Sequence, residues 1–252
     1  MSEVRLLLTA IQYFTRIPVP AWVGHSQDQL SGAARYFPAV GLLIGCAGAL
    51  ALWLFAQVLP GPLPVILSTV VTVLLTGAFH EDGLADTFDG LGGGSTRERA
   101  LEIMKDSRVG TYGAIALVLT LLLKLAALDA LPLELAMIAL VGAHPFSRAC
   151  AVTLIFGSSY VGSAEHSRAK PVALGMSNGE FFVALVFGVA PLALCGTRAI
   201  AGIAASLLAL GILAGWFTRR LGGYTGDTLG ATQQITEVTF YLALLATWTI
   251  AP

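Results

Sequence analysis

The sequence predicts an all-α integral membrane protein, a bundle of about seven transmembrane helices preceded by an N-terminal interfacial helix. Hydrophobic residues make up 56% of the 252 residues and charged residues only 12%. The mean hydropathy of +0.79 lies well above that of a soluble protein with a mixed-charge surface. Several apolar runs also approach the roughly 20 residues that a helix needs to cross the hydrocarbon layer. Most of the chain is therefore expected to face lipid or itself.

Seven apolar runs are candidate spans: Pro38–Leu59, Pro62–Phe79, Gly110–Ala130, Leu133–Phe156, Phe181–Cys195, Ala199–Phe217 and Val238–Pro252. The Phe181–Cys195 run is short, so we expect it to tilt little or to be extended by its preceding flank. The opening run Leu6–Ile17 is interrupted by polar residues and followed by Pro18 and Pro20. This pattern predicts a helix that lies in the membrane interface. No small-residue cleavage site closes the run, so we expect it to remain in the mature protein.

The connections between these spans predict the orientation. Short hairpins at Pro60–Gly61, Leu131–Pro132 and Gly196–Thr197 place the three long loops, Glu81–Arg108, Gly157–Glu180 and Thr218–Glu237, on one shared face. Ten basic residues lie on that face: Arg16, Arg35, Arg97, Arg99, Lys105, Arg108, Arg168, Lys170, Arg219 and Arg220. The opposite hairpins carry only Arg198. The positive-inside rule therefore predicts that the shared face is cytoplasmic. No internal repeat or linker divides the chain, so we expect one membrane domain over residues 1–252.

Composition argues against several other classes of protein. The net charge is −1, and no basic stripe alternates with aromatic residues, so nucleic-acid binding is not expected. Cys46, Cys150 and Cys195 fall inside apolar runs without paired spacing. They predict neither a disulfide framework nor a zinc site, and we interpret them as small core residues.

The strongest chemical signal is an acidic cluster where the second span meets the shared face. Seven of the fifteen acidic residues fall within Glu81–Asp106. Asp82, Asp86 and Asp89 stand at i, i+4 and i+7, so on a helix they lie within about 60° of one face. Carboxylates this close repel one another unless they share a cation. Oxygen ligands favour a hard ion, and a site left open for phosphate oxygens suits Mg²⁺.

The alternative is a solvated acidic helix end without a ligand. Two features count against it. The nearest basic partners come only later, at Arg97 and Arg99. The cluster is also flanked by Gly83, Gly90 and the glycines at 92–94, which a purely structural helix would avoid. We therefore favour the metal site.

The residues after the glycines predict a second short helix. Ser95–Glu98 matches a capping box, so a helix is expected from near Arg97 to Asp106. Lys105 and Arg108 stand at its end, where they could contact a substrate phosphate. Attraction to lipid headgroups explains them equally well.

Three further polar features lie elsewhere in the chain. His144 and Arg148 stand at i and i+4 in an apolar span, and such residues by default mark a functional cavity in a membrane. The alternative is a buried ion pair that only fixes helix packing. Lys124 is near the outer end of its span and can extend to the interface, so we assign it no role. Asp227 and Thr228, after a glycine-rich turn, reach the shared face, although an Asp in this context fits a turn equally well.

These stretches together resemble the cobalamin synthase family, the cobalamin 5′-phosphate synthases also called adenosylcobinamide-GDP ribazoletransferases. The stretches that carry the resemblance are Phe14–Pro18 (FTRIP), Tyr36–Gly41 (YFPAVG), Gly77–Gly90 (GAFHEDGLADTFDG), Met104–Gly113 (MKDSRVGTYG), His144–Ala149 (HPFSRA) and Gly222–Thr228 (GGYTGDT). They cover nearly the whole chain in order, and the acidic string is the most specific of them.

The resemblance implies a transferase of the last steps of cobamide assembly, resident in the bacterial inner membrane and dependent on Mg²⁺. A hydroxyl of α-ribazole, or of its 5′-phosphate, would attack the cobinamide-linked phosphorus of adenosylcobinamide-GDP, and GMP would leave. The implied partners are these small molecules and membrane lipid. A homo-oligomer and an association with other cobamide-assembly enzymes both stay open.

Site residues can be assigned on this basis. Asp82, Asp86 and Asp89 would hold the metal, with Glu81 or Asp106 contributing. Phosphate oxygens would be held by Arg108 and Arg148, and the further substrate contacts are Lys105, His144, Asp227 and Thr228. Asp82, His80 and Arg148 are the catalytic candidates. The base for the attacking hydroxyl is His80 or a carboxylate, and the sequence does not choose between them.

Two rivals fit less well. A CDP-alcohol phosphotransferase also uses clustered aspartates, but the stretch Asp82–Asp86 lacks the arginine and the second half of that family's pattern. A cation-coupled transporter would need acidic residues at mid-membrane depth. The acidic cluster instead lies at a loop junction on the shared face, and only Asp129 and Glu134 lie near the other end.

Overall fold

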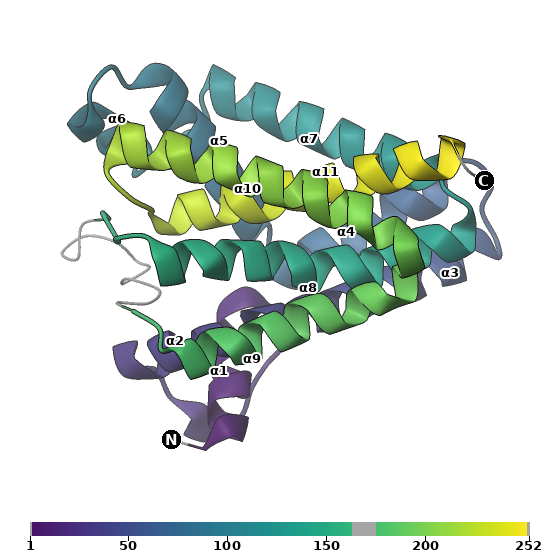
Figure 1. The fold of residues 1–252 in the computed structure, drawn as a ribbon, viewed down its shortest axis with the longest axis horizontal. Helices are drawn as coiled ribbons and strands as arrows, with labels where there is room; N and C mark the ends of the chain where they lie inside the picture. The colour runs from purple at the N-terminus through teal and green to yellow at the C-terminus, as the bar shows by residue number, and fades with distance from the viewer. Residues whose placement is uncertain (1, 163–174, 251–252) are drawn as a thin grey trace.

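The computed structural model describes residues 2–162 and 175–250, and within them every regular element is a helix (Figure 1). The α-helices are α1 (Glu3–Phe14), α2 (Gln27–Ala33), α3 (Phe37–Ala56), α4 (Leu63–Thr76), α5 (Phe79–Gly93), α6 (Arg97–Ile103), α7 (Thr111–Asp129), α8 (Leu133–Gly157), α9 (Asn178–Val189), α10 (Ala199–Leu221) and α11 (Gly226–Ile250). Three 3-10 helices, η1 (Ala21–Val23), η2 (Ala34–Tyr36) and η3 (Ala190–Arg198), connect them. The predicted all-α class is confirmed.

Four helical stretches in the described part of the chain are long and apolar enough to cross a membrane: Asp28–Ala56, Thr111–Asp129, Leu133–Gly157 and Asn178–Leu221. The bent pair α4 and α5 makes a fifth if it counts as one span. The stretch Asn178–Leu221 contains two of the seven expected spans, because α9 and α10 run in opposite directions around η3 (Figure 1). The chain is a polytopic membrane protein.

The last helix differs from the expectation of a span over residues 238–252. Helix α11 begins at Gly226, and its first half carries Gln233, Gln234 and Glu237 buried inside the bundle. Polar side chains are tolerated in a membrane bundle when they face its interior. The helix therefore extends twelve residues further toward the N-terminus than the apolar pattern alone indicated.

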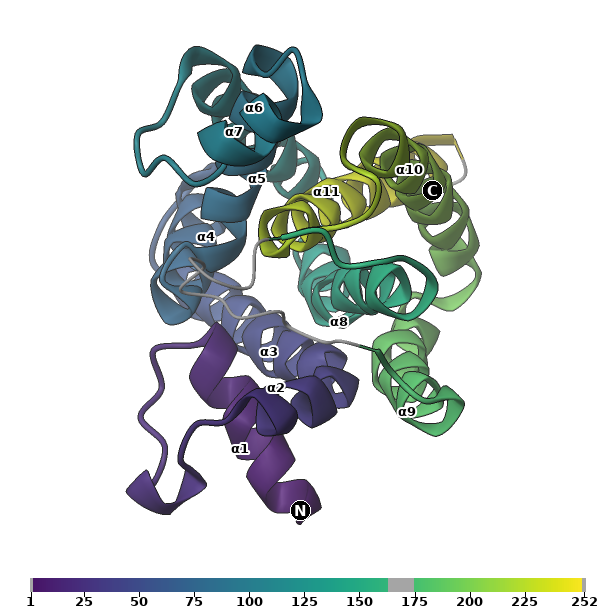
Figure 2. The ribbon, with the colours of Figure 1, turned by 90° about the vertical axis from the view of Figure 1, so that its left-hand side faces the viewer.

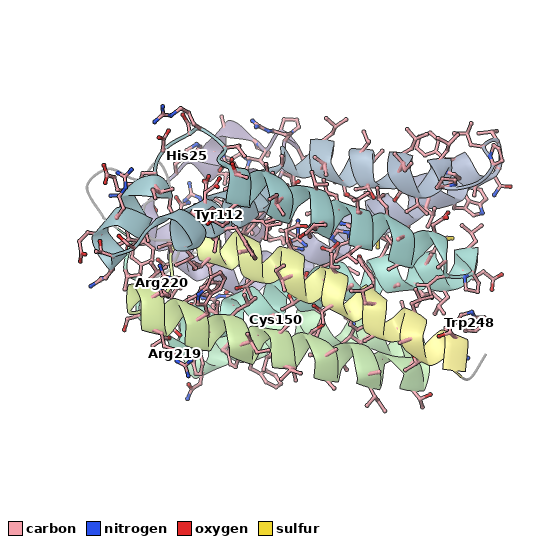
Figure 3. All side chains as sticks on the ribbon, turned by 90° about the horizontal axis from the view of Figure 1, so that it is seen from above. His25, Tyr112, Cys150, Arg219, Arg220 and Trp248 are labelled. Atoms are coloured by element: carbon pink, nitrogen blue, oxygen red, sulfur yellow. The ribbon has the colours of Figure 1, made fainter. Side chains whose placement is uncertain are left out.

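The expected hairpins and loops lie at opposite ends of the bundle. The α3–α4 and α7–α8 connections lie at the end where the chain terminates, and the α5–α6 and α10–α11 connections lie at the other (Figure 1). Side chains follow the same division, with Arg219 and Arg220 at one end and Trp248 at the other (Figure 3). Arg168 and Lys170 lie outside the described residues. We call the end that carries α6 the loop end.

Helix α8 is the most buried of the long apolar helices, and glycines let α3 lie against it. A Cβ added to Gly41 would come 2.6 Å from the His144 carbonyl oxygen, and one on Gly45 would come 2.5 Å from that of Leu140. Small residues four apart are the usual device for such close helix contact in membranes. These glycines therefore set the position of His144 and Arg148.

A sharp bend separates the second span from the acidic helix. Gly77 and Ala78 both have left-handed φ values, 66° and 59°, and α5 leaves α4 at 87°. Helix α4 has 14 residues, about 21 Å at 1.5 Å per residue, and is shorter than a typical span. The bend carries α5 across the bundle, where it packs on α11 (Figure 2).

The predictions for the short helix after the glycines, for the N-terminal helix and for the cysteines are confirmed only in part. The helix after the glycines starts at Arg97 as expected, with the Thr96 side chain accepting from the Arg99 N–H, but it ends at Ile103. Helix α1 ends at Phe14, before the prolines. Cys150 and Cys195 are buried and free, whereas Cys46 is exposed, so its assignment to the core is wrong.

Candidate active site

Asp82 and Asp86 lie on one face of α5 without a partner of opposite charge. Asp82 is exposed and Asp86 half-buried. Their i, i+4 spacing places the two Cβ atoms about 5–6 Å apart. Neither carboxylate makes a hydrogen bond or an ion pair within the described residues. The predicted helix geometry is confirmed, and the pair has oxygen atoms free for a ligand.

Helix α11 brings Asp227 to the same face. A Cβ added to Gly83 would come 2.9 Å from the Asp227 carbonyl oxygen, and one on Gly230 would come 3.1 Å from that of His80. Because neither glycine has a side chain, the two backbones approach closely beside Asp82. The predicted convergence of Asp227 with the acidic cluster is therefore present.

Asp89, on the same face of α5, is bound by another helix. Its carboxylate accepts the backbone N–H groups of Gly110, at 2.7 Å, and Gly113, at 2.8 Å. These are donors at the N-terminus of α7, which an acidic side chain satisfies well. Asp89 is buried and caps α7, which ties the acidic helix to the next apolar helix.

Asp106 and Arg108 neutralise each other after α6. Arg108 donates to both Asp106 oxygens, and this pairing lowers the pKa of Asp106 to about 2. Arg108 is exposed, as is Lys105. The structure thus pairs the predicted extra metal ligand with the predicted phosphate ligand at the surface.

Thr228 forms part of the hydrogen-bonded turn that begins α11. Its hydroxyl accepts the Thr225 N–H at 2.8 Å, and the Thr225 hydroxyl accepts the Thr228 N–H at 3.2 Å. This exchange satisfies backbone groups at the start of α11. Thr228 is fully buried, so its hydroxyl is not presented to a substrate.

A buried polar network lies behind the acidic face, centred on Glu237. The Glu237 carboxylate accepts a hydrogen bond from Lys124 Nζ at 2.5 Å and another from the Tyr241 hydroxyl at 3.2 Å. His144 Nδ1 lies 3.1 Å from it, and Gln233 Nε2 also donates to it. All five side chains are at most 3% exposed. The assignment of Lys124 to the interface is wrong, because Glu237 supplies a buried counter-charge that the lysine reaches from α7.

Arg148 and Glu81 border this network. Arg148 Nη1 donates to the His144 carbonyl oxygen at 2.9 Å, but its Nε–H has no partner among the described residues. Glu81 accepts from Gln234 Nε2 at 3.0 Å, while its other oxygen is also unpartnered. Glu81 therefore points toward the network rather than toward Asp82 and Asp86. His144 and Arg148 lie together, as their spacing predicted.

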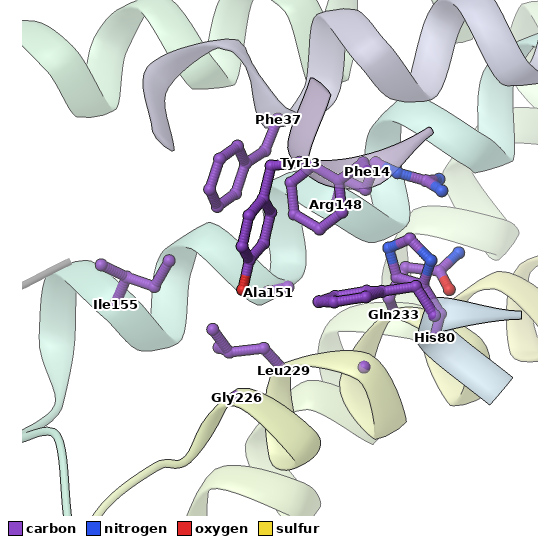
Figure 4. A pocket seen from close by; sticks show the side chains of 12 residues that line it. Tyr13, Phe14, Phe37, His80, Arg148, Ala151, Ile155, Gly226, Leu229 and Gln233 are labelled. Carbon is purple, nitrogen blue, oxygen red and sulfur yellow. The ribbon is translucent and has the colours of Figure 1, made fainter. Parts of the chain in front are cut away.

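A narrow pocket opens beside the network, between α1, α3, α5, α8 and α11 (Figure 4). Its lining has three parts: the aromatic rings of Tyr13, Phe14, Phe37 and Phe79, the aliphatic side chains of Ala151, Ile155 and Leu229, and a polar end of His80, Arg148 and Gln233. His80 stacks on Phe14 with ring centroids 5.3 Å apart. Gly226 and Gly230 also line it, on either side of Asp227.

The acidic face fits a metal in its chemistry but does not by itself form a closed site. The described residues contain no group of three His, Cys, Asp or Glu side chains arranged to hold an ion. The free oxygens of Asp82 and Asp86, with Asp227 alongside, are the hard donors that Mg²⁺ prefers. Mg²⁺ commonly takes one or two carboxylates and completes its shell with water and substrate phosphate. An open site of that kind fits these residues.

Sequence reasoning missed several residues at this site: Tyr13, Lys124, Gln233 and Glu237. A signal for the last two was present, since Gln233 and Glu237 stand at i and i+4 before an apolar run. That spacing places two polar side chains on one helix face. Nothing in the sequence indicated that Tyr13 would face the same pocket as Arg148.

Comparison with known proteins decides the family. The family model for cobalamin-5-phosphate synthase matches residues 6–245. The chain belongs to this family. The match spans both the acidic helix α5 and the buried network.

Curated relatives of this cobalamin-5-phosphate synthase family member share about half of its residues. A protein of Leptothrix cholodnii named adenosylcobinamide-GDP ribazoletransferase is 51% identical, covering 98% of this chain and 97% of that protein. Proteins of the same name from Shewanella sp. strain W3-18-1 and Shewanella frigidimarina are 49% and 47% identical, over 97% and 98% of this chain and 95% and 96% of their own length. No solved structure matches the chain.

Proposed function

We propose that this family member is a Mg²⁺-dependent adenosylcobinamide-GDP ribazoletransferase. It would join adenosylcobinamide-GDP to α-ribazole, or to α-ribazole 5′-phosphate, and release GMP. The name of the relatives, which cover nearly the whole chain, supports the substrates. The observation that carries the site is the pair of partnerless carboxylates on α5, Asp82 and Asp86, with Asp227 against them.

The proposed reaction is a displacement at phosphorus. The nucleoside hydroxyl oxygen forms a bond to the cobinamide-linked phosphorus, the bond from that phosphorus to the bridging oxygen breaks, and GMP leaves with that oxygen. Such reactions need little covalent chemistry from the protein and depend on positioning and charge stabilisation. Bound Mg²⁺ would supply positive charge to the phosphate oxygens.

The residues of this chain would act around that centre. Asp82 and Asp86 would hold the metal from α5. Arg148, whose Nε–H is buried and unpartnered, would donate to a phosphate or sugar oxygen near the pocket. The proton of the attacking hydroxyl would pass to His80, which lines the pocket, or to a carboxylate of the acidic face.

We also propose that the loop end faces the cytoplasm in the bacterial inner membrane. The ten basic residues assigned to that side against one on the other support the orientation. The orientation also places Asp82 and Asp86 on the side where nucleotide substrates are made.

The test uses the purified full-length protein in lipid nanodiscs. Adenosylcobinamide-GDP is supplied with α-ribazole or its 5′-phosphate, and GMP release is followed with Mg²⁺, with EDTA, and after Mg²⁺ is restored. We expect GMP to form only when both substrates and Mg²⁺ are present. Equal GMP formation in EDTA would remove the metal from the proposal, and no GMP under any condition would overturn the proposed reaction.

A further inference from the structure

The first three helical elements, α1, η1 and α2, form an N-terminal hairpin at the loop end of the bundle. Viewed from that end, α1 is seen along its length, whereas α8 and α10 are seen nearly end-on (Figure 2). Both ends of the hairpin are fixed to spanning helices. The Arg16 backbone N–H donates to the Leu75 carbonyl oxygen in the last turn of α4 at 2.8 Å, and α2 continues through η2 directly into α3. The hairpin is therefore held at the level where these helices reach the loop end.

Helix α1 turns its most apolar face toward the protein. Leu6, Ala10 and Phe14 on that face are buried. The Leu6 side chain lies over Gly32 of α2, and the Phe14 ring packs on Phe37 at the start of α3, with centroids 4.4 Å apart. An interfacial helix binds a bilayer through its apolar face, and here that face is occupied by protein. The main lipid contact of the hairpin must therefore come from another part of it.

The turn that contains η1 holds one apolar side chain inside and the preceding one outside. Val23 is fully buried, and its carbonyl oxygen accepts from Arg5 Nε at 3.1 Å and from Gln29 Nε2 at 2.8 Å. Arg5 Nη2 also donates to the Trp22 carbonyl oxygen at 2.5 Å. These bonds tie the turn to both α1 and α2. Trp22 is consequently presented on the outside of the hairpin, with 54% of its surface exposed.

Four more exposed apolar residues accompany Trp22, three in the segment before it and one on α1: Pro18, Pro20, Ala21 and Val4. We call these five residues the η1 patch. Its segment leaves α4 at Arg16, whose backbone is bonded to Leu75. The preceding residue, Leu74, is exposed on α4, as is Val70 one turn earlier. The η1 patch therefore continues the apolar surface that a spanning helix presents to lipid.

We propose that the η1 patch is a membrane anchor that inserts among the lipid headgroups of the leaflet at the loop end. Trp favours this depth, because its ring is apolar while its N–H still reaches water or headgroup oxygens. Pro18 and Pro20 have no backbone N–H to leave unpaired there. Arg16 is exposed at the start of the segment and has no carboxylate partner within the described residues, so it is free to pair with a lipid phosphate.

A protein partner fits the η1 patch less well than lipid does. The patch lies at the level set by the loop ends of α3 and α4, and it adjoins the lipid-facing side of α4 at Leu74. A soluble protein would have to displace lipid to cover it. The bilayer is already present at this level and needs no further partner.

The anchor also connects the bilayer to the acidic helix. Phe14 of α1 stacks on His80 of α5, with ring centroids 5.3 Å apart. The Arg16 side chain lies over Gly77 at the bend before α5, where an added Cβ would come 2.3 Å from Arg16 Nε. A hairpin held on the bilayer by η1 keeps these contacts of α1 in place at the start of α5.

Fluorescence quenching by brominated lipids tests the anchor. The chain has four Trp residues, so the variant Trp53→Phe/Trp216→Phe/Trp248→Phe leaves Trp22 as the only emitter. The full-length variant is placed in nanodiscs, one copy in each, made of phosphatidylcholine that carries bromine either near the headgroup end or near the methyl end of its acyl chains. We expect bromine near the headgroups to lower the Trp22 emission roughly twofold or more, and deep bromine to lower it much less, because an interfacial Trp lies at headgroup level.

The matched control places the single emitter on another exposed part of the loop end. Glu98→Trp, combined with Trp22→Phe and the three other replacements, puts it on α6, where Glu98 is exposed and the helix lies at the outer edge of the loop end (Figure 1). Neither brominated lipid should quench it. If the variants with several replacements do not fold, as judged by their elution and melting profiles, the wild type is compared with the single variant Trp22→Phe. Quenching by the shallow bromine should then be smaller in Trp22→Phe.

Two results would overturn the anchor. Trp22 emission that neither bromine position quenches would mean that the indole ring is in water or is covered by protein, and equal quenching of wild type and Trp22→Phe would mean the same. Stronger quenching by the deep bromine would place the η1 turn within the hydrocarbon layer instead of among the headgroups. Preferential quenching of Trp22 by the shallow bromine, with the Glu98→Trp control unquenched, would support the proposal.

Discussion

Lys124 on α7 and Glu237 on α11 form an ion pair of 2.5 Å inside the bundle, with side chains 3% and 0% exposed. A buried charge that loses its partner typically costs about 3–5 kcal/mol. Lys124→Met should therefore lower the melting temperature of the detergent-purified protein markedly. The double variant Lys124→Met/Glu237→Gln should recover part of that loss, since no uncompensated charge stays buried.

The control for this pair is Lys105→Met, because Lys105 is exposed on the loop between α6 and α7. Its melting temperature should match the wild type. A Lys124→Met protein as stable as Lys105→Met would show that the ion pair contributes little to folding.

The same pair marks the limit of prediction from the sequence. The apolar runs predicted the long helices because hydropathy reports directly on contact with lipid, and the i, i+4, i+7 spacing predicted the acidic face because helix geometry fixes it. Lys124 and Glu237 are 113 positions apart, and the residues around either one do not indicate that it pairs with the other. Their pairing depends on how α7 packs on α11. The sequence alone therefore could not show whether Lys124 faces the lipid or the core of the bundle.

The 87° bend between α4 and α5 shows a second limit. The expected span Pro62–Phe79 ran straight through this bend, where Ala78 has a φ of 59°, which an alanine rarely adopts. Only the surrounding packing can impose that conformation. Likewise, Asp89 belonged to the predicted metal ligands by spacing, whereas its bonds to Gly110 and Gly113 depend on where α7 begins.

Gly83 sets the approach of α5 to α11, and replacing it should disturb the acidic face. In Gly83→Ala the new Cβ would meet the Asp227 carbonyl oxygen at 2.9 Å, so the helices must separate by a few tenths of an ångström. We expect GMP release to fall about tenfold or more, because small misplacements at a reacting centre have large effects on rate. Gly215→Ala is the matched control on α10, where an added Cβ meets nothing within 4 Å. Similar rates for the two variants would contradict this role of Gly83.

Asp89 should behave as a helix cap when tested without metal. Asp89→Ala removes the acceptor of two backbone N–H groups at the start of α7, and losing a cap costs about 0.5–2 kcal/mol. We expect its melting temperature in EDTA to fall below that of wild type, while Asp89→Asn retains part of the stability through its side-chain oxygen. Equal melting in EDTA for Asp89→Ala and wild type would argue against the cap.

Asp82 should show the opposite behaviour, with lost activity and kept stability. Its side chain is exposed and makes no contact that folding needs, so Asp82→Ala should insert into membranes and melt like the wild type. Removing a ligand that positions charge on the reacting phosphate should lower GMP release about a hundredfold or more. Asp129→Ala is the control, because Asp129 is exposed at the other end of the bundle and should leave the rate unchanged. Asp82→Asn, which keeps one neutral oxygen donor, should turn over at a raised Mg²⁺ requirement. An Asp82→Ala protein with a near-normal rate at limiting Mg²⁺ would mean that the metal is held elsewhere, even with the family assignment intact.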